Sequence, residues 1–347
     1  MTADTHAPRD GAAPHWSTLP DDQLLDVRLC DLDLSIQGSE LEPRIALING
    51  ELESRGLIRP AYWISDEWFS PDGVPGVAVP FYLLHPRLVK LELAQMLEVE
   101  GGDEAICLKI LRHEAGHAVD NAYQLRRRRA RREIFGLPST RYPEYYTPKP
   151  YSKSFVQHLD HWYAQSHPDE DFAETFAVWL TPGLDWRKRY AGWKALQKLE
   201  YVDELMGSLA GKPPASLPGY RAAEYDCLGV KLKTYYARKR KAYEHSFPDF
   251  YDNDLRQLFD ADPKASGPVL ASEYLRRHRH QLTNAVCQWT NENRYRVDQL
   301  VTRIINRCDA LGLHIRAYDP KQNLHVSAYI TTLVMNHLFT GKFKRTK

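Results

Sequence analysis

Two histidines and a glutamate form the pattern in this chain that is best suited to chemistry. His113, Glu114 and His117 make an H-E-x-x-H motif. Positions four residues apart lie on one face of a helix about one turn apart, so the two imidazoles could bind one metal ion. Glu114 would then point toward the open position of the metal and take a proton from bound water. The motif predicts part of a catalytic metal centre and needs a further ligand.

A second acidic segment could supply that ligand. A catalytic zinc ion takes three protein ligands and keeps a fourth position for water. Glu170 and Glu174 are four residues apart on a segment with an apolar face for packing. If the two helices pack together, Glu170 ligates the metal, and Glu174 hydrogen-bonds a ligand histidine and fixes its tautomer. We assign Asp120 the same supporting role as Glu174. A plain helix N-terminus is the alternative interpretation of the acids at 169–174.

The first of these helices is predicted to begin at Asp103, a candidate N-cap after two glycines. We expect it to run past Tyr123 into the basic run at 126–132. That run, and a second one with interleaved tyrosines at 231–241, could bind nucleic acid. Solvated helix faces are the alternative, and the net charge of +1 favours them.

The second helix is predicted to begin with Ser166 as its N-cap and to stop at Thr181-Pro182-Gly183. A Pro- and Tyr-rich loop at 136–152 lies between the two helices. The loop is long for a structureless connection, and such loops often form lids or cleft walls. We therefore expect it to lie over the site.

The N-terminal part is expected to supply a small antiparallel sheet. Alternating apolar residues predict a strand within 24–36. Two aromatic and β-branched runs at 61–69 and 76–84 flank the turn signal Ser70-Pro71-Asp72-Gly73, which predicts a hairpin. Pro80 makes the second run an edge strand that could hold an extended peptide.

Breaks in the pattern indicate the domain organisation. Residues 1–20 are mostly polar and predicted to be disordered. A Pro-rich break after residue 212 separates a domain at 21–212 from a mostly helical region at 219–347. The predicted fold class is α+β.

Charge, hydropathy and cysteine content exclude several classes of protein. A net charge of +1 and the lack of a long apolar run predict neither nucleic-acid nor membrane partners. The five cysteines are scattered without a C-x-x-C, which indicates reduced thiols in a cytoplasmic protein.

The two motifs together resemble a known group of enzymes. Glu114–Asp120 (EAGHAVD) and Glu170–Phe176 (EDFAETF) are similar to the gluzincin metallopeptidases and to the catalytic domain of anthrax lethal factor. The likeness is closer to a bacterial family of zinc-binding metallopeptidases with a P-x-E-D-[FW]-A-E-[ST]-[FW]-A segment, which Pro168–Ala177 matches. The resemblance covers residues 105–185 and implies a zincin-like fold with one Zn²⁺.

The resemblance also implies a role for each residue of the site. His113, His117 and Glu170 become the zinc ligands, with Glu114 the general base and Glu174 the carboxylate behind a ligand.

A tyrosine seven residues before the ligand glutamate is implied as well, and Tyr163 stands there. Its phenol could donate a hydrogen bond to the substrate oxygen that becomes negative. His161 and His167 are nearby alternatives for this role.

The expected function is zinc-dependent hydrolysis of peptide bonds in a peptide or protein substrate, with metal-bound water activated by Glu114. The alternative is a zinc-stabilised binding or regulatory module without turnover that works through residues 219–347. Nucleic-acid binding through the basic runs is a third interpretation.

Overall fold

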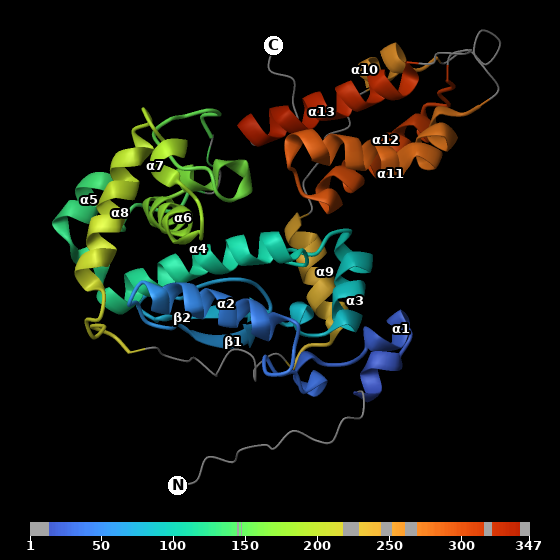
Figure 1. Cartoon of the computed structure of the whole chain (residues 1–347). Helices are drawn as coiled ribbons and strands as arrows, with labels where there is room; N and C mark the ends of the chain where they lie inside the picture. The colour runs from blue at the N-terminus through green and yellow to red at the C-terminus, as the bar shows by residue number, and fades with distance from the viewer. Residues whose placement is uncertain are drawn as a thin grey trace.

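Helices make up most of this protein, and one small sheet accompanies them among the residues that the structure describes. A computed structural model describes residues 14–143, 146, 148–217, 229–243, 252–260, 269–315 and 321–340. Two helices, α4 (Glu104–Tyr123) and α6 (Pro168–Leu180), cross in the N-terminal part (Figure 1). Around them lie β1 (Ala61–Ser65), β2 (Gly76–Pro80), α2 (Leu41–Ser54), α3 (Pro86–Met96), α5 (Arg129–Phe135), α7 (Trp186–Arg189) and α8 (Ala195–Leu209).

The two strands are parallel, so the predicted antiparallel hairpin is wrong. Trp63 of β1 pairs with Ala78 of β2 in a parallel register. The predicted turn lies against α4, and a single antiparallel bridge, between Phe69 and Ala78, flanks it in place of a two-stranded hairpin. The Asn121 side chain accepts a hydrogen bond from the Gly73 amide and donates one to the Pro71 carbonyl, each at 3.0 Å. The chain reverses after β1 and reverses again at this turn, so this detour brings it into β2 in the direction of β1.

The second strand is also not a free edge at its centre. Phe69, which lies in the detour, pairs with Ala78 on the side of β2 that faces away from β1. The Ala78 amide donates to the Phe69 carbonyl at 2.8 Å. The prediction that this strand has a free edge for an extended peptide is therefore wrong at Ala78, because both sides of this residue are already paired.

The predicted strand within 24–36 is also wrong. Two short helical segments occupy it, α1 (Asp21–Leu24) and η2 (Leu29–Leu32). The apolar alternation changes phase between Leu29 and Leu32, so one face of a strand could not bury both side chains. In the 3-10 turn they lie three residues apart on one side, and both are fully buried.

Both central helices begin near their predicted caps. The Asp103 side chain accepts a hydrogen bond from the Ile106 amide at 3.1 Å, which confirms the predicted cap of α4. The cap of α6 is His167 and not the predicted Ser166. Its Nδ1 atom accepts from the Asp169 amide at 3.1 Å.

Helix α4 ends earlier than predicted. Gln124 adopts the left-handed conformation with φ of 51°, which terminates the helix after Tyr123. The basic run at 126–132 is therefore not a continuation of α4. Part of it forms the separate helix α5.

The C-terminal helices are divided between two clusters of buried side chains. Helix α9 (Leu232–Tyr243) packs Tyr235 and Tyr236 against Phe81 and Tyr82 of the N-terminal part. The remaining helices are α10 (Asp252–Leu258), α11 (Ala271–Thr290), α12 (Arg294–Ala310) and α13 (Gln322–Thr340). They pack mainly with one another, although Tyr295 of α12 belongs to the same cluster as α9 (Figure 1).

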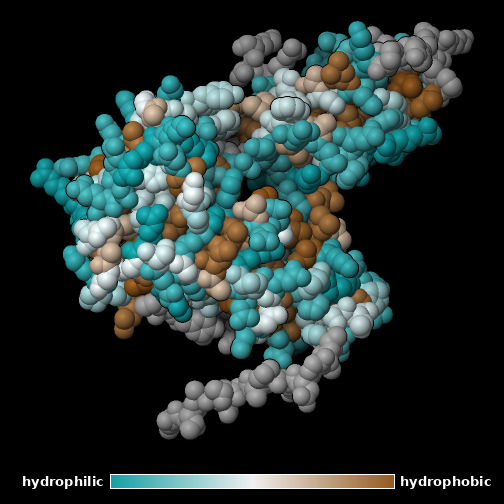
Figure 2. Space-filling model, in the orientation of Figure 1, coloured by the Kyte–Doolittle hydropathy of each residue, from teal (hydrophilic) through white to brown (hydrophobic). Residues whose placement is uncertain are grey.

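The predicted division into 21–212 and 219–347 stays a prediction. Of the predicted tail at 1–20, residues 1–13 lie outside the described ones, whereas Trp16 is buried in the cluster that also holds α9. None of the described helices combines the length and the apolar character needed to span a bilayer. The face in Figure 2 is largely hydrophilic, with its apolar residues in separate patches.

Helices α4 and α6 approach each other closely at Gly116. A Cβ atom there would lie 3.0 Å from Ala173 Cα and 3.2 Å from the Ala173 carbonyl oxygen, so a methyl group would force the α6 backbone to move by a few tenths of an ångström. Gly116 is part of the histidine motif. Its contact therefore sets how near the acids of α6 come to the imidazoles.

The substitution Gly116→Ala is expected to lower the free energy of unfolding by about 1–3 kcal/mol, because the α6 backbone must move away. Chemical denaturation measures this change. The matched control is Gly207→Ala in α8, where nothing lies within 4 Å of an added Cβ. There the higher helix propensity of alanine should raise stability by about 0.5–1 kcal/mol. Similar effects at both positions would contradict the close approach.

Candidate metal centre

His113, His117 and Glu170 come together where α4 and α6 cross. The Nε2 atoms of the two histidines lie 3.1 Å apart. Glu170 Oε2 lies 3.0 Å from the first and 3.1 Å from the second. All three residues are buried, and one ligand atom from each lies within 4.8 Å of the others. Two imidazole nitrogens and a carboxylate oxygen are a donor set that suits zinc, so the residues fit such an ion.

Glu174 contacts His113 at Nδ1, the ring nitrogen that faces away from Glu170 and His117. Its Oε1 lies 2.8 Å from His113 Nδ1, and its Oε2 accepts a hydrogen bond from the Leu159 amide at 2.8 Å. In the neutral form that binds a metal, a proton at Nδ1 would leave the lone pair of Nε2 directed toward Glu170 and His117. The structure therefore brings Glu174 to one of the two motif histidines, and its supporting role stays a prediction.

The buried carboxylates favour a positive charge among the imidazoles. Burial alone lowers the pKa of His113, but hydrogen bonds to Glu170 and Glu174 outweigh it and raise that pKa to about 10. Burial raises the pKa of Glu170, yet His117 and His113 bring it well below its usual range. A metal cation would supply the positive charge that this arrangement stabilises.

Ser70 holds the carboxylate of Glu114 and was not recognised as a site residue from the sequence. Its Oγ lies 2.9 Å from Glu114 Oε2 and 3.2 Å from the Glu114 carbonyl oxygen. The hydroxyl therefore donates to Glu114 and limits the rotation of its side chain. Ser70 belongs to the loop that Asn121 anchors on α4. The turn signal at 70–73 marked the position but not this contact.

Tyr163 lies beside the first histidine, in the 3-10 helix η5 (Asp160–Gln165). Its ring centroid is 5.6 Å from that of His113. Within the part of the chain that the structure describes, its hydroxyl has no hydrogen-bond acceptor. Burial and the charge of Glu170 raise the pKa of Tyr163, so the phenol stays a protonated donor at neutral pH.

The alternatives to Tyr163 are less well placed. His167 uses both ring nitrogens: Nδ1 accepts from the Asp169 amide, and Nε2 donates to the Thr140 carbonyl at 2.7 Å. It therefore has no donor left for a substrate oxygen. The side chain of His161 lies outside what the structure describes.

Tyr142 contacts the metal group from the loop at 136–152. Its Oη lies 2.7 Å from Glu170 Oε1, and its ring stacks on His167 with centroids 3.7 Å apart. The composition of the loop predicted that it covers the site. Nothing in its pattern distinguished Tyr142 from the other tyrosines there, and residues 144, 145 and 147 lie outside the described ones.

Asp120 makes no hydrogen bond to either histidine among the described residues. Its carboxylate accepts from Arg131 and from the Arg126 amide, each at 3.0 Å. Arg131 is fully buried and also donates to Asp169 at 2.6 Å. The structure therefore places Asp120 in an ion network that joins the end of α4 to the start of α6. Two arginines of the basic run at 126–132 belong to this network.

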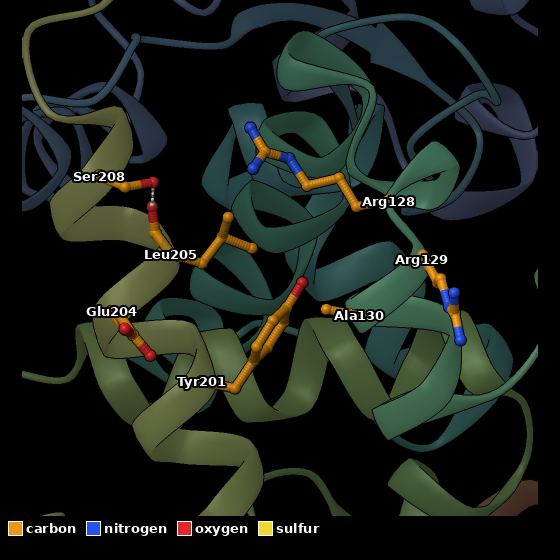
Figure 3. A pocket seen from close by; sticks show the side chains of 7 residues that line it. All are labelled: Arg128, Arg129, Ala130, Tyr201, Glu204, Leu205 and Ser208. Atoms are coloured by element: carbon orange, nitrogen blue, oxygen red, sulfur yellow. Dashed lines mark hydrogen bonds between the residues drawn. The ribbon is translucent and has the colours of Figure 1, made fainter.

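Figure 3 shows a pocket elsewhere, between the start of α5 and helix α8. Its lining residues are Arg128, Arg129, Ala130, Tyr201, Glu204, Leu205 and Ser208. No residue of the metal group lines it, so it has no part in the candidate site.

Residues 106–184 match the model of a protein family described as "Putative zinc-binding metallo-peptidase". The matched stretch contains both helices of the metal group but less than half of the chain. No curated protein and no solved structure matches the chain. The finer likeness to gluzincins and to lethal factor stays a prediction. What the comparison supports is a resemblance to zinc-binding metallopeptidases over the segment that builds the site.

Proposed function

We propose that this protein is a zinc-dependent peptidase that hydrolyses peptide bonds in a peptide or protein substrate. The observation that carries the proposal is the convergence of His113, His117 and Glu170, with the charge of Glu114 acting on His113. Two imidazoles and one carboxylate are the protein ligands of many catalytic zinc ions. The family match over residues 106–184 supports the same assignment.

The proposal gives the surrounding side chains distinct tasks. A zinc ion held by the group would polarise the scissile carbonyl and a water molecule. Glu114 accepts the proton of the attacking water and passes it to the leaving amine. Ser70 keeps the Glu114 carboxylate in one orientation. Tyr163 donates a hydrogen bond to the carbonyl oxygen as it becomes negative.

A zincin-like fold and kinship with the gluzincins belong to the same proposal. The crossing of α4 and α6 and the small sheet beside α4 support them. We also propose a cytoplasmic location, supported by the free thiols of the described cysteines. They are Cys30, Cys107, Cys287 and Cys308.

We expect no nucleic-acid partner, because key cations of both basic runs are engaged within the chain. Arg131 is buried between two aspartates. Lys239 lies 2.7 Å from Glu92, which is itself buried. Such paired cations are poor ligands for phosphates.

The substitution Glu170→Ala is expected to abolish zinc binding, because two imidazoles alone hold zinc weakly. Mass spectrometry of protein purified without added zinc measures the metal content. We expect about one zinc ion per wild-type chain and much less in the variant. The control is Glu200→Ala, which removes an exposed carboxylate on α8. Equal zinc in wild type and Glu170→Ala would show that the third ligand is misassigned.

The substitution Glu114→Gln is expected to retain zinc and to lower the rate of hydrolysis by about 10²–10⁴-fold, because an amide cannot accept the proton of water. Cleavage of a mixed peptide library, followed by mass spectrometry, measures the activity. Comparable cleavage by both proteins would contradict the role of Glu114. A wild-type protein that binds zinc but cleaves nothing would favour the alternative, a zinc-stabilised module without turnover.

The substitution Ser70→Ala is expected to lower kcat by about 10–100-fold with unchanged zinc content, because the Glu114 carboxylate loses its hydrogen bond. The same peptide substrate serves for this measurement. Ser70→Thr retains a hydroxyl and should recover most of the activity. A kcat for Ser70→Ala equal to that of wild type would exclude the positioning role of Ser70.

A further inference from the structure

We infer that Tyr142 is a positioning residue that holds the carboxylate of Glu170 so that one chosen oxygen faces the metal. The inference rests on the proposed zinc site and extends it to a residue that no motif of the sequence assigns. It concerns the binding of the metal and not the chemistry of hydrolysis.

The two oxygens of Glu170 have different partners. Oε2 faces the two imidazoles, at 3.0 Å from His113 Nε2 and 3.1 Å from His117 Nε2. Oε1 lies on the other side and is 2.7 Å from the Tyr142 hydroxyl. A phenol has a single proton to donate, and the carboxylate can only accept. The hydrogen bond therefore holds Oε1 away from the imidazoles and leaves Oε2 as the ligand atom.

The position of Tyr142 is itself set by the cap of α6. The ring of Tyr142 stacks on that of His167 with an angle of 12° between the planes. His167 Nδ1 accepts from the Asp169 amide, so Nε2 carries the proton and donates to the Thr140 carbonyl at 2.7 Å. One buried imidazole thus caps the helix that carries Glu170 and fixes the loop that carries the phenol. His167 therefore sets the distance between the Tyr142 hydroxyl and the Glu170 carboxylate.

Loss of the hydroxyl should weaken the site without dismantling it. In Tyr142→Phe the ring can still stack on His167, but Oε1 of Glu170 loses its donor and both oxygens become available to the metal. Removal of such an outer hydrogen bond typically costs about 10–100-fold in metal affinity.

The experiment compares zinc affinities of the full-length chain by competition with a coloured chelator. Tyr142→Phe should bind zinc about 10–100-fold more weakly than wild type. The matched control is Tyr151→Phe, which removes a hydroxyl from the same loop at a residue that is 83% exposed. Its affinity should equal that of wild type. Equal affinities of all three proteins would overturn the inference and leave the zinc site itself intact.

A second measurement tests the mechanism with Co²⁺ in place of zinc. A carboxylate that binds through both oxygens raises the coordination number, which weakens the visible absorption of Co²⁺. We expect this change in Tyr142→Phe and not in Tyr151→Phe. Weaker zinc binding with an unchanged cobalt spectrum would refute the positioning role. A wild-type chain that binds no zinc would instead refute the proposed function, and with it this inference.

Discussion

The close contact between the backbones of α4 and α6 at Gly116 and Ala173 is the constraint on which the candidate site depends. The two motif histidines lie on either side of Gly116, and the two glutamates of α6 lie on either side of Ala173. Because Gly116 has no side chain at the closest approach, a carboxylate of α6 reaches the imidazoles of α4 directly. Metal–ligand distances tolerate deviations of only about 0.2 Å, so a spacer of even one methyl group would disturb the group.

Groups outside the two helices complete the site, and each is attached through an anchor on one of them. Ser70 holds Glu114 from a loop that Asn121 fastens to α4. Tyr142 holds Glu170 from a loop that His167 fastens to the start of α6. Loops supply these side chains, but their positions are set by helices. Such support from rigid elements is what a precise site requires.

The buried ion network reinforces the same crossing. Arg131 lies between Asp120 at the end of α4 and Asp169 at the start of α6, with its side chain fully buried. Buried ion pairs contribute little net stability, because desolvation offsets the attraction between the charges. They do restrict geometry, since a buried charge that loses its partner is costly. The network therefore acts mainly to keep the two helices in one relative position.

The sequence by itself determined the features that depend on local spacing. An interval of four residues puts His113 and His117 on one helix face, and Glu170 and Glu174 on one face of the other helix. The sequence predicts this because helix geometry depends only on spacing along the chain. The cap at Asp103 is equally local. These features predicted the metal group and the helices that carry it.

Only the tertiary structure decided the features that depend on distant contacts. Ser70 meets Glu114 across 44 positions, and Tyr142 meets Glu170 across 28, so no periodic pattern reveals either pair. The strands are parallel because the chain reverses twice between them, and the connecting turn lies on Asn121 of α4, a contact that turn propensity cannot indicate. Asp120 has the residue type of a supporting carboxylate, but burial of Arg131 beside it directs it into an ion network instead. In each case the contact depends on which side chain of a distant element packs against the residue, and the local sequence does not contain that information.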